Sequence, residues 1–70
     1  MKCIIERYGY KTMWEFGDRE KFEEYELELP TSVLLIGNKL RLPDNRIVEI
    51  FDTLYDVNIA TQIVRVFATF

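Results

Sequence analysis

The chain has 70 residues, of which 49% are hydrophobic and 14% aromatic, and its formal net charge is −3 at neutral pH. This length predicts a single domain, residues 1–70, with one small hydrophobic core. With no histidine and one cysteine, Cys3, the chain has no internal disulfide, no histidine-containing zinc site and no catalytic pair that uses histidine. The sequence also lacks the basic stripe that neutralises phosphates, which argues against direct nucleic-acid binding.

The N-terminal residues predict neither secretion nor membrane attachment. The apolar run at residues 3–5 is too short for the core of a signal peptide, and no window holds the ~20 apolar residues of a membrane helix. A single unpaired cysteine fits a reducing compartment. We therefore expect a cytoplasmic protein with Cys3 buried and unreactive.

The first part of the chain predicts short strands separated by turns. Residues 2–8 alternate in character and read as a strand, which Gly9 is expected to end at a turn or kink. A second short strand is expected over residues 12–16, and residues 17–18 form a strong turn signal.

Residues 19–29 fit two structures. In the second half of this segment, apolar residues alternate with glutamates, which predicts a half-buried strand with its carboxylates facing water. However, Phe22, Tyr25 and Leu29 also stand at helical spacing, and glutamate, lysine and leucine favour helix. We favour the strand and leave open a short helical turn over residues 18–22.

Three further strands are expected in the second half of the chain. A short apolar strand over residues 33–36 precedes a turn at residues 37–38 and a strand over residues 39–42. Residues 43–45 read as a tight turn because proline presets φ while aspartate and asparagine tolerate turn conformations. One long strand should then cross the domain to residue 56, with a bulge or exposed rim at Asp52-Thr53. Its two faces are expected to carry Val48, Ile50 and Leu54 on one side and Ile47, Phe51 and Tyr55 nearer the other.

The chain is expected to end in a hairpin. Its loop, residues 56–61, contains no glycine, so Asn58 is the residue expected at any left-handed position. Residues 62–69 form the last strand. Five or six short strands predict an all-β fold, with at most one short helix, as a small SH3-like or OB-like barrel or sandwich. Closure would remove the sheet edges of so apolar a chain.

No motif for chemistry is present. The three glycines are far apart, so the sequence has no phosphate-binding loop, and the lone cysteine rules out a multi-cysteine metal site. Paired carboxylates are plentiful, so a two-carboxylate hydrolase is not excluded by residue type, but the chain is too small to enclose a substrate. We expect no enzyme activity, no cofactor and no metal.

Two groups of residues are candidates for a binding surface. The aromatic group either fills the barrel or forms a contact patch, since tyrosine and tryptophan are common at interfaces; it comprises Tyr8, Tyr10, Trp14 and Phe16. The acidic group either keeps the chain soluble or forms a carboxylate row that binds a basic partner or imitates a nucleic-acid backbone; it comprises Glu24, Glu26 and Glu28.

The segment from residue 33 to residue 55 resembles small β-barrel proteins of tailed bacteriophages and prophages. The likeness rests on Ile36-Gly37-Asn38-Lys39-Leu40-Arg41-Leu42-Pro43 and Arg46-Ile47-Val48-Glu49-Ile50. It implies a phage origin inside a bacterial host, with either an accessory role in the virion or a role in binding a host protein. The resemblance carries no catalytic motif, so no functional residues transfer from it.

These observations favour a non-enzymatic module that binds a protein or assembles with itself. The high apolar content of so short a chain supports this, because some apolar surface stays uncovered in a monomer. The alternative is an acidic inhibitor that mimics nucleic acid and occupies a host protein that binds DNA or RNA.

Overall fold

The computed structural model describes residues 1–10 and 19–68 and is built almost entirely of strands. One 3₁₀ turn, η1 (Thr31–Val33), joins the N-terminal and C-terminal strands. The strands are β1 (Lys2–Tyr10), β2 (Arg19–Glu28), β3 (Lys39–Arg41), β4 (Ile47–Asp56) and β5 (Thr61–Ala68). The predicted all-β class is confirmed. The strand expected at residues 12–16 and the turn at 17–18 lie outside the described residues.

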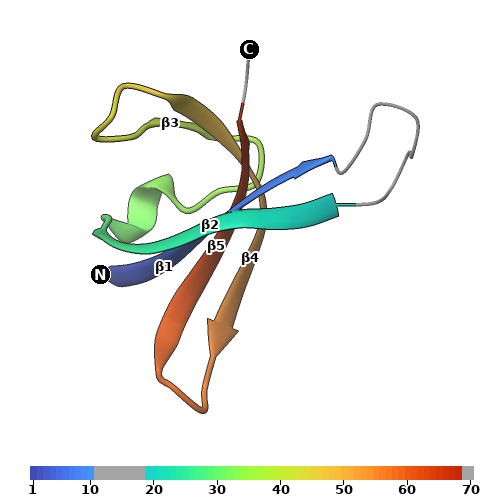
Figure 1. The fold of residues 1–70 in the computed structure, drawn as a ribbon. Coiled ribbons are helices and arrows are strands. Elements are labelled where there is room, and N and C mark those ends of the chain that lie inside the picture. Colours follow the sequence, from blue (N-terminus) through green and yellow to red (C-terminus); the bar gives the residue numbers. More distant parts are fainter. Residues whose placement is uncertain (11–18, 69–70) are drawn as a thin grey trace.

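The five strands form one sheet in the order β2-β1-β5-β4-β3. β1 and β5 are parallel, and the other neighbours are antiparallel. The strands rotate steeply from one side of the sheet to the other, so that the sheet curls into a half-barrel (Figure 1). β2 and β3 are its two edges, and β5 is its central strand.

The core lies on the inner face of this curled sheet. The register places Ile5 beside Tyr25 on one side and beside Val64 on the other, so these residues share that face. The residues that alternate with them form the outer face. The buried core consists of Cys3, Ile5, Leu42, Val48, Ile50, Val64 and Val66.

β2 is a strand throughout, which settles the ambiguity of residues 19–29. Tyr25 and Leu27 are half-buried against the core, whereas the glutamates that alternate with them, at positions 24, 26 and 28, are exposed. Phe22, whose spacing suggested a helix, is 54% exposed. It sits at a β-bulge, where the register with β1 shifts between Arg7 and Tyr8.

The prediction that Gly9 ends the first strand is wrong. Gly9 lies inside β1, where it serves a packing role. A side chain at this position would collide with the ring of Phe22. Arg7 lies over the same ring, with its guanidinium carbon 5.9 Å from the ring centroid. The glycine therefore makes room for the aromatic residue of the bulge, and β1 continues to Tyr10.

The predicted strand at residues 33–36 is wrong. Residues 31–33 form η1, with Val33 N donating to Pro30 O at 3.2 Å, and the following residues form a turn and irregular backbone. Leu35 and Ile36 are 62% and 69% exposed. Apolar composition alone suggested a strand here, but the segment lies outside the sheet and its backbone groups pair in turns.

The tight turn between β3 and β4 is confirmed. Asn45 adopts a φ of 70°, Asn45 N donates to Leu42 O, and Leu42 N donates to Arg46 O, both at 2.8 Å. The turn at Gly37, with a φ of 90°, is also present.

Two details of β4 and its hairpin differ from prediction. The bulge is found between Ile50 and Asp52, and it moves Leu54 to the outer face, opposite Ile63, where it is 45% exposed. In the hairpin loop the left-handed residue is Ala60, with a φ of 50°, and Asn58 is not left-handed. Asn58 N instead donates to Asp56 Oδ1 at 2.9 Å, a local bond that aspartate makes in turns.

Candidate protein-binding cleft

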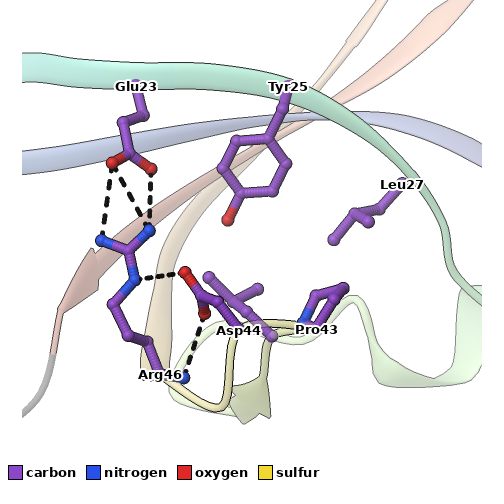
Figure 2. A pocket seen from close by; sticks show the side chains of 7 residues that line it. Glu23, Tyr25, Leu27, Pro43, Asp44 and Arg46 are labelled. Carbon is purple, nitrogen blue, oxygen red and sulfur yellow. Dashed lines mark hydrogen bonds and ion pairs between the residues drawn. The ribbon is translucent and has the colours of Figure 1, made fainter.

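A cleft opens between edge strand β2 and the turn that joins β3 to β4. Its volume is about 240 Å³. Side chains of β2 point across it toward the turn (Figure 2). The residues that line it are Glu23, Tyr25, Leu27, Leu42, Pro43, Asp44 and Arg46. The cleft therefore lies where the half-barrel remains open, between strands that are not neighbours in the sheet.

An ion-pair group crosses one end of this opening. Arg46 donates from Nη2 to Glu23 Oε2 at 3.2 Å and from Nε to Asp44 Oδ2 at 2.5 Å. Glu23 also accepts a bond from Arg7 Nη2 on β1 at 2.9 Å. Arg46 thus ties the turn to β2 (Figure 2). Because Glu23 also pairs with Arg7, the same group of ion pairs reaches β1.

These contacts lower the pKa of both cleft carboxyl groups. The hydrogen bond from Arg7, followed by that from Arg46, holds the pKa of Glu23 below its ordinary value. For Asp44 the largest cause is the backbone N–H of Arg46, which donates to Oδ1. Both groups are therefore ionised at neutral pH, and neither is prepared to act as a general acid.

The floor of the cleft is apolar, with one polar atom that lacks a partner. Leu27 and Leu42 form the floor with the ring of Tyr25. The hydroxyl oxygen of Tyr25 is buried, and within the described residues it has no hydrogen-bond partner. Burial raises the pKa of Tyr25, and the charge of Glu23 adds to the effect. This hydroxyl is therefore a buried polar atom beside the cleft whose hydrogen bond is not satisfied within the described residues.

The predicted acidic row lies on the same strand, facing outward. Glu24, Glu26 and Glu28 are exposed on the outer face of β2, and each has a cation of this chain within 4 Å. The distances are 3.6 Å from Lys21 Nζ to Glu24, 3.1 Å from Lys2 Nζ to Glu26, and 3.8 Å from the N-terminal amine to Glu28. Such exposed pairs are weak and exchange readily.

The predicted aromatic group is only partly described. Trp14 and Phe16 lie outside the described residues, and for Tyr10 the backbone alone is described. Tyr8 is half-buried on the outer face, and its ring meets that of Phe51 edge-on at 5.6 Å. Phe51 in turn stacks on Phe67 at 4.2 Å. The neighbours of Tyr8 thus come from β4 and β5.

The loop end of the β4–β5 hairpin exposes several large apolar side chains. It extends away from the other strands (Figure 1). The exposed residues there are Leu54, Tyr55, Val57 and Ile59. An exposed apolar patch of this kind is a second candidate for a protein-binding surface.

Other kinds of site find little support in the described residues. No three carboxylate or cysteine side chains of residues 1–10 and 19–68 are grouped so that they could hold a metal ion. Over the same ranges, no helix has the length and apolar character needed to cross a membrane.

The chain matches no protein-family model, no curated protein and no solved structure. The resemblance to phage barrels therefore stays a prediction, and any functional proposal depends on the geometry described above.

Sequence reasoning identified the acidic row but missed the cleft. The sequence pattern predicts the alternation of Tyr25 and Leu27 and the turn at Pro43. It does not predict that this strand and this turn lie close together, because their proximity depends on the curl of the sheet and on a strand order that has no local signal.

Proposed function

We propose that this chain is a non-enzymatic protein-binding module whose binding site is the cleft and the open edge of β2. The observation that carries the proposal is a cleft with an apolar floor that lies beside the edge strand β2. An edge strand offers unpaired backbone donors and acceptors, and a neighbouring apolar cleft can take side chains of the bound segment. The site thus offers both backbone pairing and side-chain recognition.

Protein binding fits this site better than catalysis or mimicry of nucleic acid. Glu23 and Asp44 are both held ionised by arginine, whereas a two-carboxylate hydrolase needs one protonated member. The carboxylates of Glu24, Glu26 and Glu28 are each paired within the chain, which weakens the negative field that a mimic requires. If the chain is phage-encoded, as the resemblance implies, the partner is a host or virion protein.

Selection from a library of random linear peptides, displayed on ribosomes, would test this function. The chain is expected to select peptides that lose about tenfold in affinity on Leu27→Ala, because a buried leucine contact contributes about 1–2 kcal/mol. Tyr25→Phe, which keeps the ring, serves as a milder cleft variant. Leu54→Ala, at the exposed hairpin end, is the control and should leave binding unchanged.

The proposal fails if the folded chain selects no peptide. It also fails if the selected peptides bind both cleft variants as tightly as the original chain. Circular dichroism of each variant establishes that the fold is retained before its binding is compared.

A further inference from the structure

We propose that the occupant of this site is an extended basic segment of another protein, which pairs with β2 as an additional strand. The inference rests on the proposed function and adds the conformation and charge of the partner. In this arrangement the partner alternates apolar residues with lysine or arginine. Its apolar residues face the cleft, and its basic residues face the acidic row of Glu24, Glu26 and Glu28.

The open edge of β2 supplies the backbone part of this argument. β2 has ten residues and pairs only with β1 within the described part of the chain. In an antiparallel pair, alternate residues direct their N–H and C=O groups away from the partner strand. The outward groups of β2 can therefore pair with an added strand, which is the usual way an extended peptide joins a sheet edge.

The cleft determines what the added strand places toward the core. A strand beside β2 has its inward side chains level with those of Tyr25 and Leu27. These two residues line the cleft together with Leu42 and Pro43. Figure 2 shows Tyr25 and Leu27 pointing from β2 toward the turn that holds Pro43. Aliphatic side chains of the partner fit this cleft.

Charge determines what the added strand places outward. β2 carries five glutamates against one arginine and one lysine. The residues at 24, 26 and 28 repeat every ~6.6–6.8 Å, the same spacing as alternate side chains on a partner strand. Lysine or arginine at every second position would stand opposite this row. The ion pairs that these glutamates make within the chain have side chains that are 39% to 77% exposed, so they are weak and the cations of a partner strand can replace them.

The same charges disfavour a second copy of this chain as the occupant. Two β2 strands pairing antiparallel would bring one glutamate row against another, and like charges opposite one another destabilise a sheet. The acidic edge therefore opposes self-association through β2 and selects for a basic partner.

A direct test uses synthetic peptides of roughly eight residues, about the length of a strand. The first alternates lysine with valine, the second has the same composition in two blocks, and the third alternates glutamate with valine. Binding to the ¹⁵N-labelled chain is followed by amide chemical shifts and fluorescence anisotropy. Only the alternating lysine peptide is expected to bind, and the shifted amides should lie in β2 and in the β3–β4 turn.

Variants of the chain separate charge from fold. Replacing Glu24, Glu26 and Glu28 together by glutamine should weaken binding about tenfold and reduce its salt dependence, since each exposed pair contributes modestly. The matched single variants are Glu26→Gln, expected to weaken binding two- to threefold, and Glu49→Gln on β4, expected to leave it unchanged. A lysine–valine peptide that is N-methylated at alternate residues, so that it cannot pair through its backbone, should not bind.

Three results would overturn the inference. They are equal binding of the block peptide, undiminished binding to the triple glutamine variant, and chemical-shift changes centred on the β4–β5 hairpin. A dimer that forms through β2 in the absence of peptide would also overturn it. If the random library instead yields cleft-binding peptides that are neither basic nor extended, the proposed function stands and this inference alone fails.

Discussion

Glu6 is a nearly buried charge on the outer face of the sheet, with 8% of its surface exposed. Its Oε1 atom accepts hydrogen bonds from Arg65 Nε and from the Tyr8 hydroxyl, each at 3.0 Å. Lys21 Nζ lies 3.8 Å from the other carboxylate oxygen. Arg65 also donates to Asp52 on β4, so one guanidinium on β5 connects strands on both sides of it. These contacts from Arg65, Tyr8 and Lys21 offset the cost of burying the Glu6 carboxylate, because a buried charge without partners destabilises the fold.

The first prediction is that Arg65→Met destabilises the fold by about 1–3 kcal/mol, because it leaves Glu6 with reduced compensation. Chemical denaturation followed by circular dichroism measures the loss. Arg41→Met, at an exposed position of β3, removes the same charge and should change stability by less than about 0.5 kcal/mol. The double variant Glu6→Gln with Arg65→Met should recover part of the loss. Equal effects at Arg65 and Arg41 would contradict this account.

The second prediction concerns stability in acid. Burial raises the pKa of Glu6, but the bonds from Arg65 and Tyr8 and the charge of Lys21 outweigh it, so the pKa is lowered from 4.5. The pKa of Glu23 is lowered from the same value by Arg7 and Arg46. The unfolded chain therefore binds more protons in acid, and the free energy of unfolding falls as the pH falls below about 5.

Urea titrations at several pH values between neutrality and pH ~3 measure this fall. Glu6→Gln and Glu23→Gln should each flatten the dependence, since neither glutamine can take up the proton. A pH dependence that is unchanged in both variants would show that other groups are responsible.

At the scale of elements, local patterns predicted the strands better than their connections. The alternation of Tyr25 and Leu27 with glutamates was sufficient to favour a strand for β2, and proline with asparagine located the β3–β4 turn. The apolar run at residues 33–36 led to the wrong prediction of a strand, because a segment joins the sheet only where a neighbouring strand is available and not on the basis of its composition. The bulge in β4 moved Leu54 outward by a single inserted residue. Such one-residue shifts exchange the two faces of a strand and have a weak local signal.

The third prediction concerns the β4–β5 loop. Ala60 is held in the left-handed region, where an alanine side chain is strained and glycine is not. Ala60→Gly should therefore stabilise the fold by about 0.5–1 kcal/mol, as measured by the denaturation midpoint. Val57→Gly, in the same loop without a positive φ, should be neutral or destabilising and serves as the control. If both substitutions have the same effect, strain at Ala60 is not the cause.

At the scale of the whole molecule, the fold depends on a pairing between the two ends of the chain. β1 and β5 align Ile5 with Val64, so the parallel pair joins segments almost 60 residues apart in the sequence. No local pattern predicts such a pairing, which explains why the strand order could not be read from the sequence. The acidic half of the candidate site was readable along one strand, whereas the cleft exists only because this pairing brings β2 opposite the β3–β4 turn.

The fourth prediction follows from this arrangement. β5 lies between β1 and β4, and Val64 and Val66 are fully buried, so their amides should open only when the whole molecule unfolds. β3 has three residues at the opposite edge of the sheet from β2 and should exchange through local opening. Native-state hydrogen exchange should therefore give free energies of opening at Val64 and Val66 equal to the global free energy of unfolding, and lower values at Leu40. Protection at Leu40 as high as at Val64 would mean that the short edge strand is part of the cooperative core and that the half-barrel opens as a single unit.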